Sequence, residues 1–213
     1  MRQIVLLWMG VWACSSVSYA VWDYTIGDGQ YEYGSLRLYD NETLLVTGGG
    51  AYRIEAFDST YVEVQATTPP LQVDVGGINS LNLRQNSTMN YYGGETSGFY
   101  IYENASAVLR GGSILHISSY QDVSWWYGEP VDQHIEMIVR VWSHDVQTNL
   151  LTGTWNVDND NDDLFDTFSI QLHDQAGYDK AIDNIMVTII PDPATLLLFG
   201  LGGWILRKPR ASV

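Results

Sequence analysis

The middle of the chain repeats its hydrophobic and polar positions with a period of 18 residues. Leu81, Phe99 and Ile117 form one apolar column at this spacing. Leu83 and Ile101 form a second column, which lapses in the next repeat. Turn-type residues keep nearly the same period, with spacings of 18, 28, 18 and 18 between Asp40, Asp58, Asn86, Asn104 and Asp122.

This period in a β-type sequence predicts an all-β fold, a short β-solenoid of about 18-residue coils over residues 21–124. Six residues at about 3.3 Å each make a face of about 20 Å, so three faces close one coil, and successive coils stack about 4.8 Å apart. Glycine pairs, Asn and Asp suit the corners because they tolerate positive φ. The alternative is an antiparallel sandwich whose strands happen to recur.

The period breaks once, around Thr67–Pro70, where ten extra residues indicate a loop. Before this loop, Leu36 and Ile54 are also 18 residues apart, but they stand one place off the later columns relative to the turn residues. Because a slip of one residue turns a side chain to the opposite face, the register before residue 70 stays open.

Residues 125–190 lose the period and predict a β-rich cap. The alternation from His134 to Trp142 is typical of a half-buried strand, and further strands are predicted at Thr152–Trp155, Phe165–Leu172 and Asn184–Ile190. Such a cap would cover the open end of the stack, where unpaired backbone groups invite aggregation.

The first 20 residues have the features of a signal peptide. Arg2 gives a positive start, and the apolar stretch Ile4–Trp12 is too short to span a bilayer, which needs roughly 20 residues. Small residues at Ser18 and Ala20 predict cleavage after Ala20. An N-terminal membrane anchor and a lipoprotein acylated on Cys14 are the alternatives.

The other end, residues 191–213, combines three features. A Pro-rich motif precedes the apolar run Leu196–Leu206, which predicts a single C-terminal hydrophobic helix. Counted from Ala194, about 13 residues cover roughly 20 Å as a helix, so the helix spans a core of about 30 Å only marginally. The motif consists of Pro191, Asp192, Pro193, Ala194 and Thr195, and the basic tail of Arg207, Lys208 and Arg210.

This order of parts resembles the PEP-CTERM sorting signal of bacterial surface and exopolysaccharide-associated proteins, with Asp192 where that family usually has Glu. The turn segments of the repeats also resemble, weakly, short bacterial β-helix repeats. The sorting-signal resemblance implies processing by signal peptidase and by an exosortase, a membrane protease that cuts near the motif. It implies a membrane-associated precursor and then a cell-surface or extracellular protein, but no activity. An ordinary C-terminal membrane tail is the alternative.

Charge and cysteine content exclude several functions. The 213 residues carry a formal net charge of -15, and residues 21–193 contain six basic against 25 acidic residues. This balance disfavours a nucleic-acid partner, which needs basic patches. The single cysteine excludes a disulfide framework and a Cys-based zinc site.

An acidic run supplies the best candidate for a metal site. Alternating carboxylates at Asp158, Asp160 and Asp162, with Asp166 as a fourth, match the oxygen ligands that calcium prefers. Asp163 stands where such loops usually need Gly, and Ser169 at the twelfth place, instead of a bidentate Glu, disfavours an EF-hand. A surface loop without an ion is the alternative.

The sequence favours a structural role at the cell surface or in the extracellular matrix over catalysis. An aromatic cluster at Trp125, Trp126 and Tyr127 offers a surface for extracellular polysaccharide, although packing explains it as well. A carbohydrate-binding or adhesive module is therefore one alternative function. A small polysaccharide-cleaving lyase or glycosidase is another, but the sequence contains no nucleophile elbow, phosphate loop or zinc-protease motif.

Overall fold

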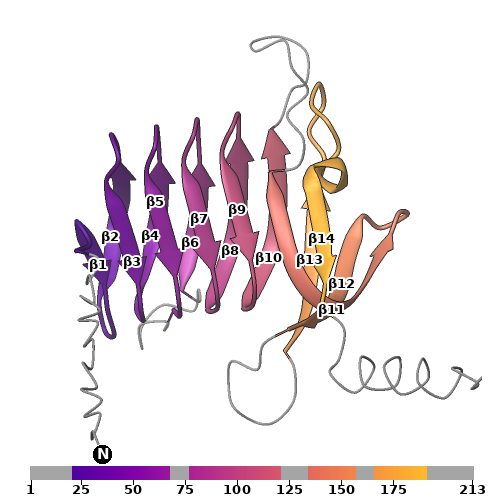
Figure 1. The fold of residues 1–213 in the computed structure, drawn as a ribbon, viewed down its shortest axis with the longest axis horizontal. Helices are drawn as coiled ribbons and strands as arrows, with labels where there is room; N and C mark the ends of the chain where they lie inside the picture. The colour runs from indigo at the N-terminus through magenta and orange to yellow at the C-terminus, as the bar shows by residue number, and fades with distance from the viewer. Residues whose placement is uncertain (1–20, 68–76, 121–133, 157–165, 191–213) are drawn as a thin grey trace, which may run out of the picture.

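The computed structural model describes residues 21–67, 77–120, 134–156 and 166–190 (Figure 1). These residues confirm the all-β prediction, with fourteen strands and one short 3-10 helix. One series of strands comprises β1 (Tyr24–Ile26), β3 (Thr43–Val46), β5 (Tyr61–Val64), β7 (Thr88–Tyr91) and β9 (Ser106–Leu109). The other comprises β2 (Tyr31–Leu38), β4 (Gly50–Ala56), β6 (Ile78–Leu83), β8 (Glu95–Tyr102) and β10 (Ser113–Tyr120).

Within each series, every strand pairs in parallel with the strand two places further along the chain. The repeats therefore follow one another along the long axis of the molecule (Figure 1). Each repeat contributes two strands, not the three expected from the face-length estimate. The continuous sheet runs from β1 through the C-terminal strands to β2 and nearly closes around one apolar core.

The predicted apolar columns are confirmed and extend further than expected. Leu81 pairs with Phe99, and Phe99 pairs with Ile117. Leu36 and Ile54 continue the same column, so the register before residue 70 is in phase with the later repeats. The second column runs through Leu38, Ala56, Leu83, Ile101 and Ser119.

The apparent register slip came from the choice of turn residue. Positive φ occurs at Asp40, Asp58, Gln85 and Glu103, with spacings of 18, 27 and 18. In the later repeats the left-handed residue therefore lies one place before Asn86 and Asn104. The break adds nine residues rather than ten, and these fall between β5 and β6.

Gly112 shows why glycine occupies the corners of the repeat. Its φ is +80°, and an added Cβ would lie 2.6 Å from the carbonyl oxygen of Gly94 in the preceding repeat. Any side chain would therefore clash with backbone that is fixed by the stacking of the repeats.

The C-terminal strands, here called the cap, continue the sheet at one end of the repeats. They are β11 (Ile135–Asp145), β12 (Leu150–Trp155), β13 (Thr167–His173) and β14 (Ile185–Ile189), with η1 (Ala181–Asn184) before β14. β11 extends the first series beside β9, and β13 extends the second beside β10. β12 joins β11 to β13 by antiparallel pairing, so the sheet continues across this end.

One polar contact joins the cap to the repeats inside the core. Ser119, where the second apolar column lapses, is fully buried. It accepts a hydrogen bond of 2.9 Å from the side-chain amide of Asn184, which is also buried. The serine that interrupts the apolar column therefore gives the buried Asn184 amide a hydrogen-bond partner, and burying that amide without a partner would cost free energy.

Candidate functional site

Most residues singled out in the sequence lie outside the described residues. These are Ala20, the sorting motif Pro191–Thr195, the basic tail Arg207, Lys208 and Arg210, the aromatic cluster Trp125–Tyr127, and Asp158, Asp160 and Asp162. Their predicted roles stay predictions. Asp166 alone among them is described.

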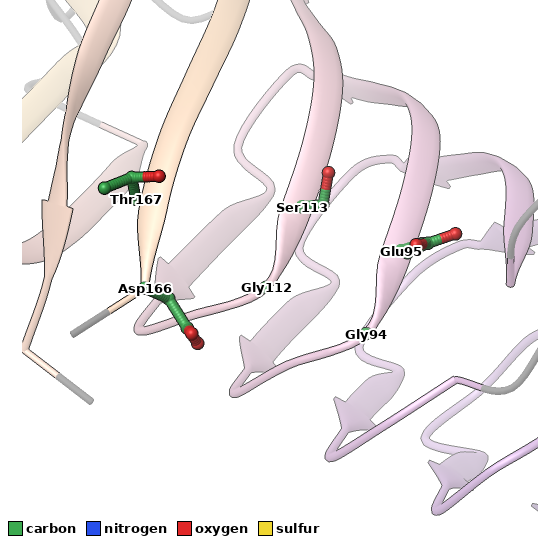
Figure 2. A pocket seen from close by; sticks show the side chains of 6 residues that line it. All are labelled: Gly94, Glu95, Gly112, Ser113, Asp166 and Thr167. Atoms are coloured by element: carbon green, nitrogen blue, oxygen red, sulfur yellow. The ribbon is translucent and has the colours of Figure 1, made fainter. Parts of the chain in front are cut away.

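Asp166 lies at a shallow hollow of about 370 Å³ on the glycine corners (Figure 2). The hollow forms where Gly94 and Gly112, both with positive φ, present bare backbone in successive repeats. Glu95, Ser113 and Thr167 complete its lining.

The geometry of this hollow does not assemble a metal site from the described residues. Strand β10 lies between β8, which carries Glu95, and β13, which Asp166 precedes. The two carboxylates point in different directions (Figure 2). Across the described ranges, no group of three or more His, Cys, Asp or Glu is placed to hold a metal ion. The calcium prediction therefore depends on Asp158, Asp160 and Asp162.

A cluster that sequence reasoning missed lies on the outer face of β8, β10 and β13. The hydroxyl of Tyr100 is 2.9 Å from Nε2 of His116. The rings of His116 and His173 stack with centroids 4.8 Å apart. Gly98 makes room for this arrangement, because an added Cβ would lie 2.7 Å from the Tyr100 ring and 2.8 Å from Nε2 of His116.

Burial lowers the pKa of the His116 imidazole, and the neighbouring His173 lowers it further. Both effects disfavour the charged form, because the ring leaves water and faces a second group that can become cationic. The cluster joins the last repeat to the cap, so its protonation bears on the stability of that junction.

We expect the free energy of unfolding to fall as the pH drops below 6.5, the ordinary pKa of histidine. The unfolded chain binds a proton at His116 more readily than the folded chain. The stability that depends on neutral His116 is therefore complete above pH 6.5, and it is lost as the pH falls through the lowered pKa of His116 in the folded state. Urea unfolding at about pH 7.5 and about pH 5.5 measures this loss.

The loss should be smaller in His116→Gln than in the wild type. His144→Gln is the matched control, because His144 contacts Asn149 in the cap and no residue of this cluster. Equal losses in the wild type and His116→Gln would show that His116 does not contribute to the pH dependence.

A ladder of planar side chains follows the second series of strands along the stack. The rings of Tyr39 and Phe57 stack 5.0 Å apart, and those of Tyr102 and Tyr120 stack 4.4 Å apart. The guanidinium of Arg84 lies between the two pairs, 5.9 Å from the Phe57 centroid and 3.9 Å from that of Tyr102. Tyr178 meets the last ring edge-on, with centroids 5.5 Å apart.

The side chains of this planar ladder contact one another from repeat to repeat. Each stacked ring uses a face against its neighbour, so that face is not free to stack on a sugar ring. Arg84 replaces an aromatic ring in the middle of the series and keeps the contact continuous through a cation–π interaction. The ladder therefore reinforces the stacking of the repeats on the outside of the sheet.

The described part of the chain contains no helix that is long and apolar enough to cross a membrane. No protein-family model matches the chain, and no curated protein or solved structure matches it either.

Proposed function

We propose that this chain is an exported structural protein of the cell surface or extracellular matrix, sorted through a C-terminal exosortase-type signal. The observation that carries the proposal is the order of parts at the C-terminus. The motif Pro191–Thr195 precedes the apolar run Leu196–Leu206 and a basic tail, in a chain that also begins with a signal-like segment. Exosortase and signal peptidase are the processing partners of this proposal, and no catalytic activity is part of it.

The arrangement of the strands supports this role. We interpret the parallel repeats as a short β-solenoid with two strands in each coil and a β-rich cap at one end. Each repeat rests on its neighbours through backbone pairing, an apolar column and the planar ladder. The stability of a stack of this kind comes from contacts between neighbouring repeats.

Charge fits the same role. Residues 21–193 contain 25 acidic and six basic residues, and among the described residues Arg37 forms a salt bridge with Glu55 at 2.8 Å. A surface with this excess of negative charge stays soluble and resists association with other polyanions.

The intact mass of the protein recovered from its native host tests the proposal. We expect a mass that corresponds to a chain beginning at residue 21 and ending near residue 193, either bare or carrying one added group. This measurement reports both cleavages at once. A mass that still includes Leu196–Val213 would mean that the tail is an ordinary membrane anchor, and the sorting proposal would fail.

A further inference from the structure

The first repeat, made of β1 and β2, lies at one end of the stack (Figure 1). These two strands are the two ends of the continuous strand order. Among the described residues β1 pairs only with β3 and β2 only with β4, whereas the strands from β3 to β8 each pair on both sides. The outer edge of β2 is therefore open, and an open edge is a template on which another chain can add a strand.

A backbone N–H after β2 shows how the first repeat differs from the later ones. In the second repeat, Phe57 donates its N–H to the carbonyl of Leu38, one repeat earlier, at 3.1 Å, and the third repeat keeps this bond at the equivalent position. Tyr39 occupies the same place in the first repeat. No described strand lies beyond it, and its N–H donates to Oε2 of Glu42 at 2.8 Å. The carboxylate of Glu42 therefore replaces the carbonyl of a preceding repeat.

The N–H that follows β1 is satisfied in the same way. Thr47 donates its N–H to the carbonyl of Ile26 in the first repeat at 3.0 Å, and the later repeats continue this pattern. Gly27 is the equivalent residue of the first repeat, because Ile26 pairs with Val46. Its N–H donates to Oε1 of Gln30 at 2.7 Å. A side chain again takes the place of the missing repeat.

Strand β2 also carries a bulge along its open edge. Between Glu32 and Ser35, which both pair with β4, the two residues Tyr33 and Gly34 stand opposite a single residue of β4. The N–H of Gly34 donates to Oε1 of Glu32 at 3.1 Å, so a charged side chain occupies this backbone donor. Bulges and charged side chains on an edge strand both hinder the addition of a further strand.

We propose that the first repeat is an end cap that prevents a second copy of the chain from adding to the outer edge of β2. Its capping side chains are Gln30, Glu32 and Glu42. A second copy is the partner that this edge must exclude, because the same edge on two molecules can pair about a two-fold axis. The acidic side chains of one edge would then approach those of the other, in a chain with a formal net charge of -15.

The end cap gives the stack a fixed length. At the opposite end, β12 joins the two series by antiparallel pairing with β11 and β13. Neither end therefore continues the parallel stacking of repeats from one molecule into the next. This inference concerns the described fold and does not depend on how the chain is sorted.

Removing the end cap in the full chain tests the proposal. The uncapped variant combines Glu32→Thr and Glu42→Thr with deletion of Gly34, which restores one-to-one pairing between β2 and β4. The matched control, Glu63→Thr with Glu95→Thr, removes the same charge from β5 and β8, which have neighbours on both sides. Light scattering in one nonionic detergent measures the protein mass of each, so any association through the C-terminal segment is common to all.

A single cysteine shows which surface associates. In a Cys14→Ser background the chain has no other cysteine, and Ser35→Cys places one at an exposed position on β2. A flexible bismaleimide then links two copies only where their β2 strands lie close together. If the uncapped variant loses cooperative unfolding, Glu32→Thr and Glu42→Thr are tested singly against Glu63→Thr, because both keep the bulge.

We expect the wild type and the control to have the same mass, and the uncapped variant to form a dimer at the same protein concentration. Linking through Ser35→Cys should be several-fold more efficient in the uncapped variant than in the capped chain. A folded uncapped variant with the wild-type mass would overturn the proposal. Association without linking through Ser35→Cys would also overturn it, because another surface would then be responsible, as would equally efficient linking in the capped chain.

Discussion

Replacing Trp155 with alanine should lower the free energy of unfolding by about 3–5 kcal/mol, the range for a fully buried large aromatic side chain. Trp155 ends β12, the strand that carries the sheet from one series to the other. Its side chain is fully buried, and the centroid of its ring lies 4.5 Å from the ring centroid of Phe168 on β13. Its indole Nε1 donates a 2.8 Å hydrogen bond to the carbonyl oxygen of Gly112.

The Trp155 contacts join three parts of the molecule: β12, β13 and the glycine corner before β10. Alanine would leave a cavity between them and an unpaired carbonyl at Gly112. Urea unfolding followed by circular dichroism measures the loss. Trp142→Ala is the control, because that side chain is 38% exposed on β11, and its change should stay below about 1 kcal/mol. Similar losses in the two variants would show that the buried contacts of Trp155 do not stabilise the fold more than an exposed tryptophan does.

The repeats were predictable because their columns are chemically simple. Leu81, Phe99 and Ile117 differ in shape but share hydrophobicity and spacing, and they pair with one another in register. The cap strands were predictable for a related reason. The alternation from His134 to Trp142 marks β11, and the segment predicted at Asn184–Ile190 contains β14. Hydrophobic periodicity survives wherever one side of a strand faces a core.

The turn residues were less predictable because several residue types tolerate the left-handed region. Asp40 and Asp58 adopt it in the early repeats, but Gln85 and Glu103 do so later, although each precedes an Asn, a residue type that tolerates the left-handed region well. Turn propensity favours the Asn in each of these pairs, so a prediction from propensity places the register one residue too late. The backbone pairing, which sequence propensity does not contain, determines the actual position.

The histidine cluster was missed because its members are close in space and distant in sequence. His116 and Tyr100 are 16 residues apart, and His173 lies on a cap strand outside the repeat. Residue spacing within one strand does not reveal a cluster whose members come from three strands. A signal was present in the repeat itself, because Gly98 aligns with His116 and leaves the space that the two rings fill.

Phe99→Ala should also lower the free energy of unfolding by about 3–5 kcal/mol. Phe99 is fully buried in the middle of the longest apolar column, between Leu81 on β6 and Ile117 on β10. Unlike Trp155, it lies within the repeats, so its loss weakens contacts on both sides along the stack. Leu115→Ala is the control, because Leu115 is 64% exposed on β10, and its change should remain within about 0.5 kcal/mol.

Amide hydrogen exchange on the Phe99→Ala variant tests how the repeats share stability. In a stack whose repeats contact only their neighbours, protection should fall most in β6, β8 and β10 and least in β2 at the far end. Equal loss of protection in every strand would instead mean that the nearly closed sheet unfolds as one unit. The first result favours the solenoid interpretation, because stability would then spread from repeat to repeat. The second would contradict it, because the long-range closure through β11, β12 and β13 would control the whole fold.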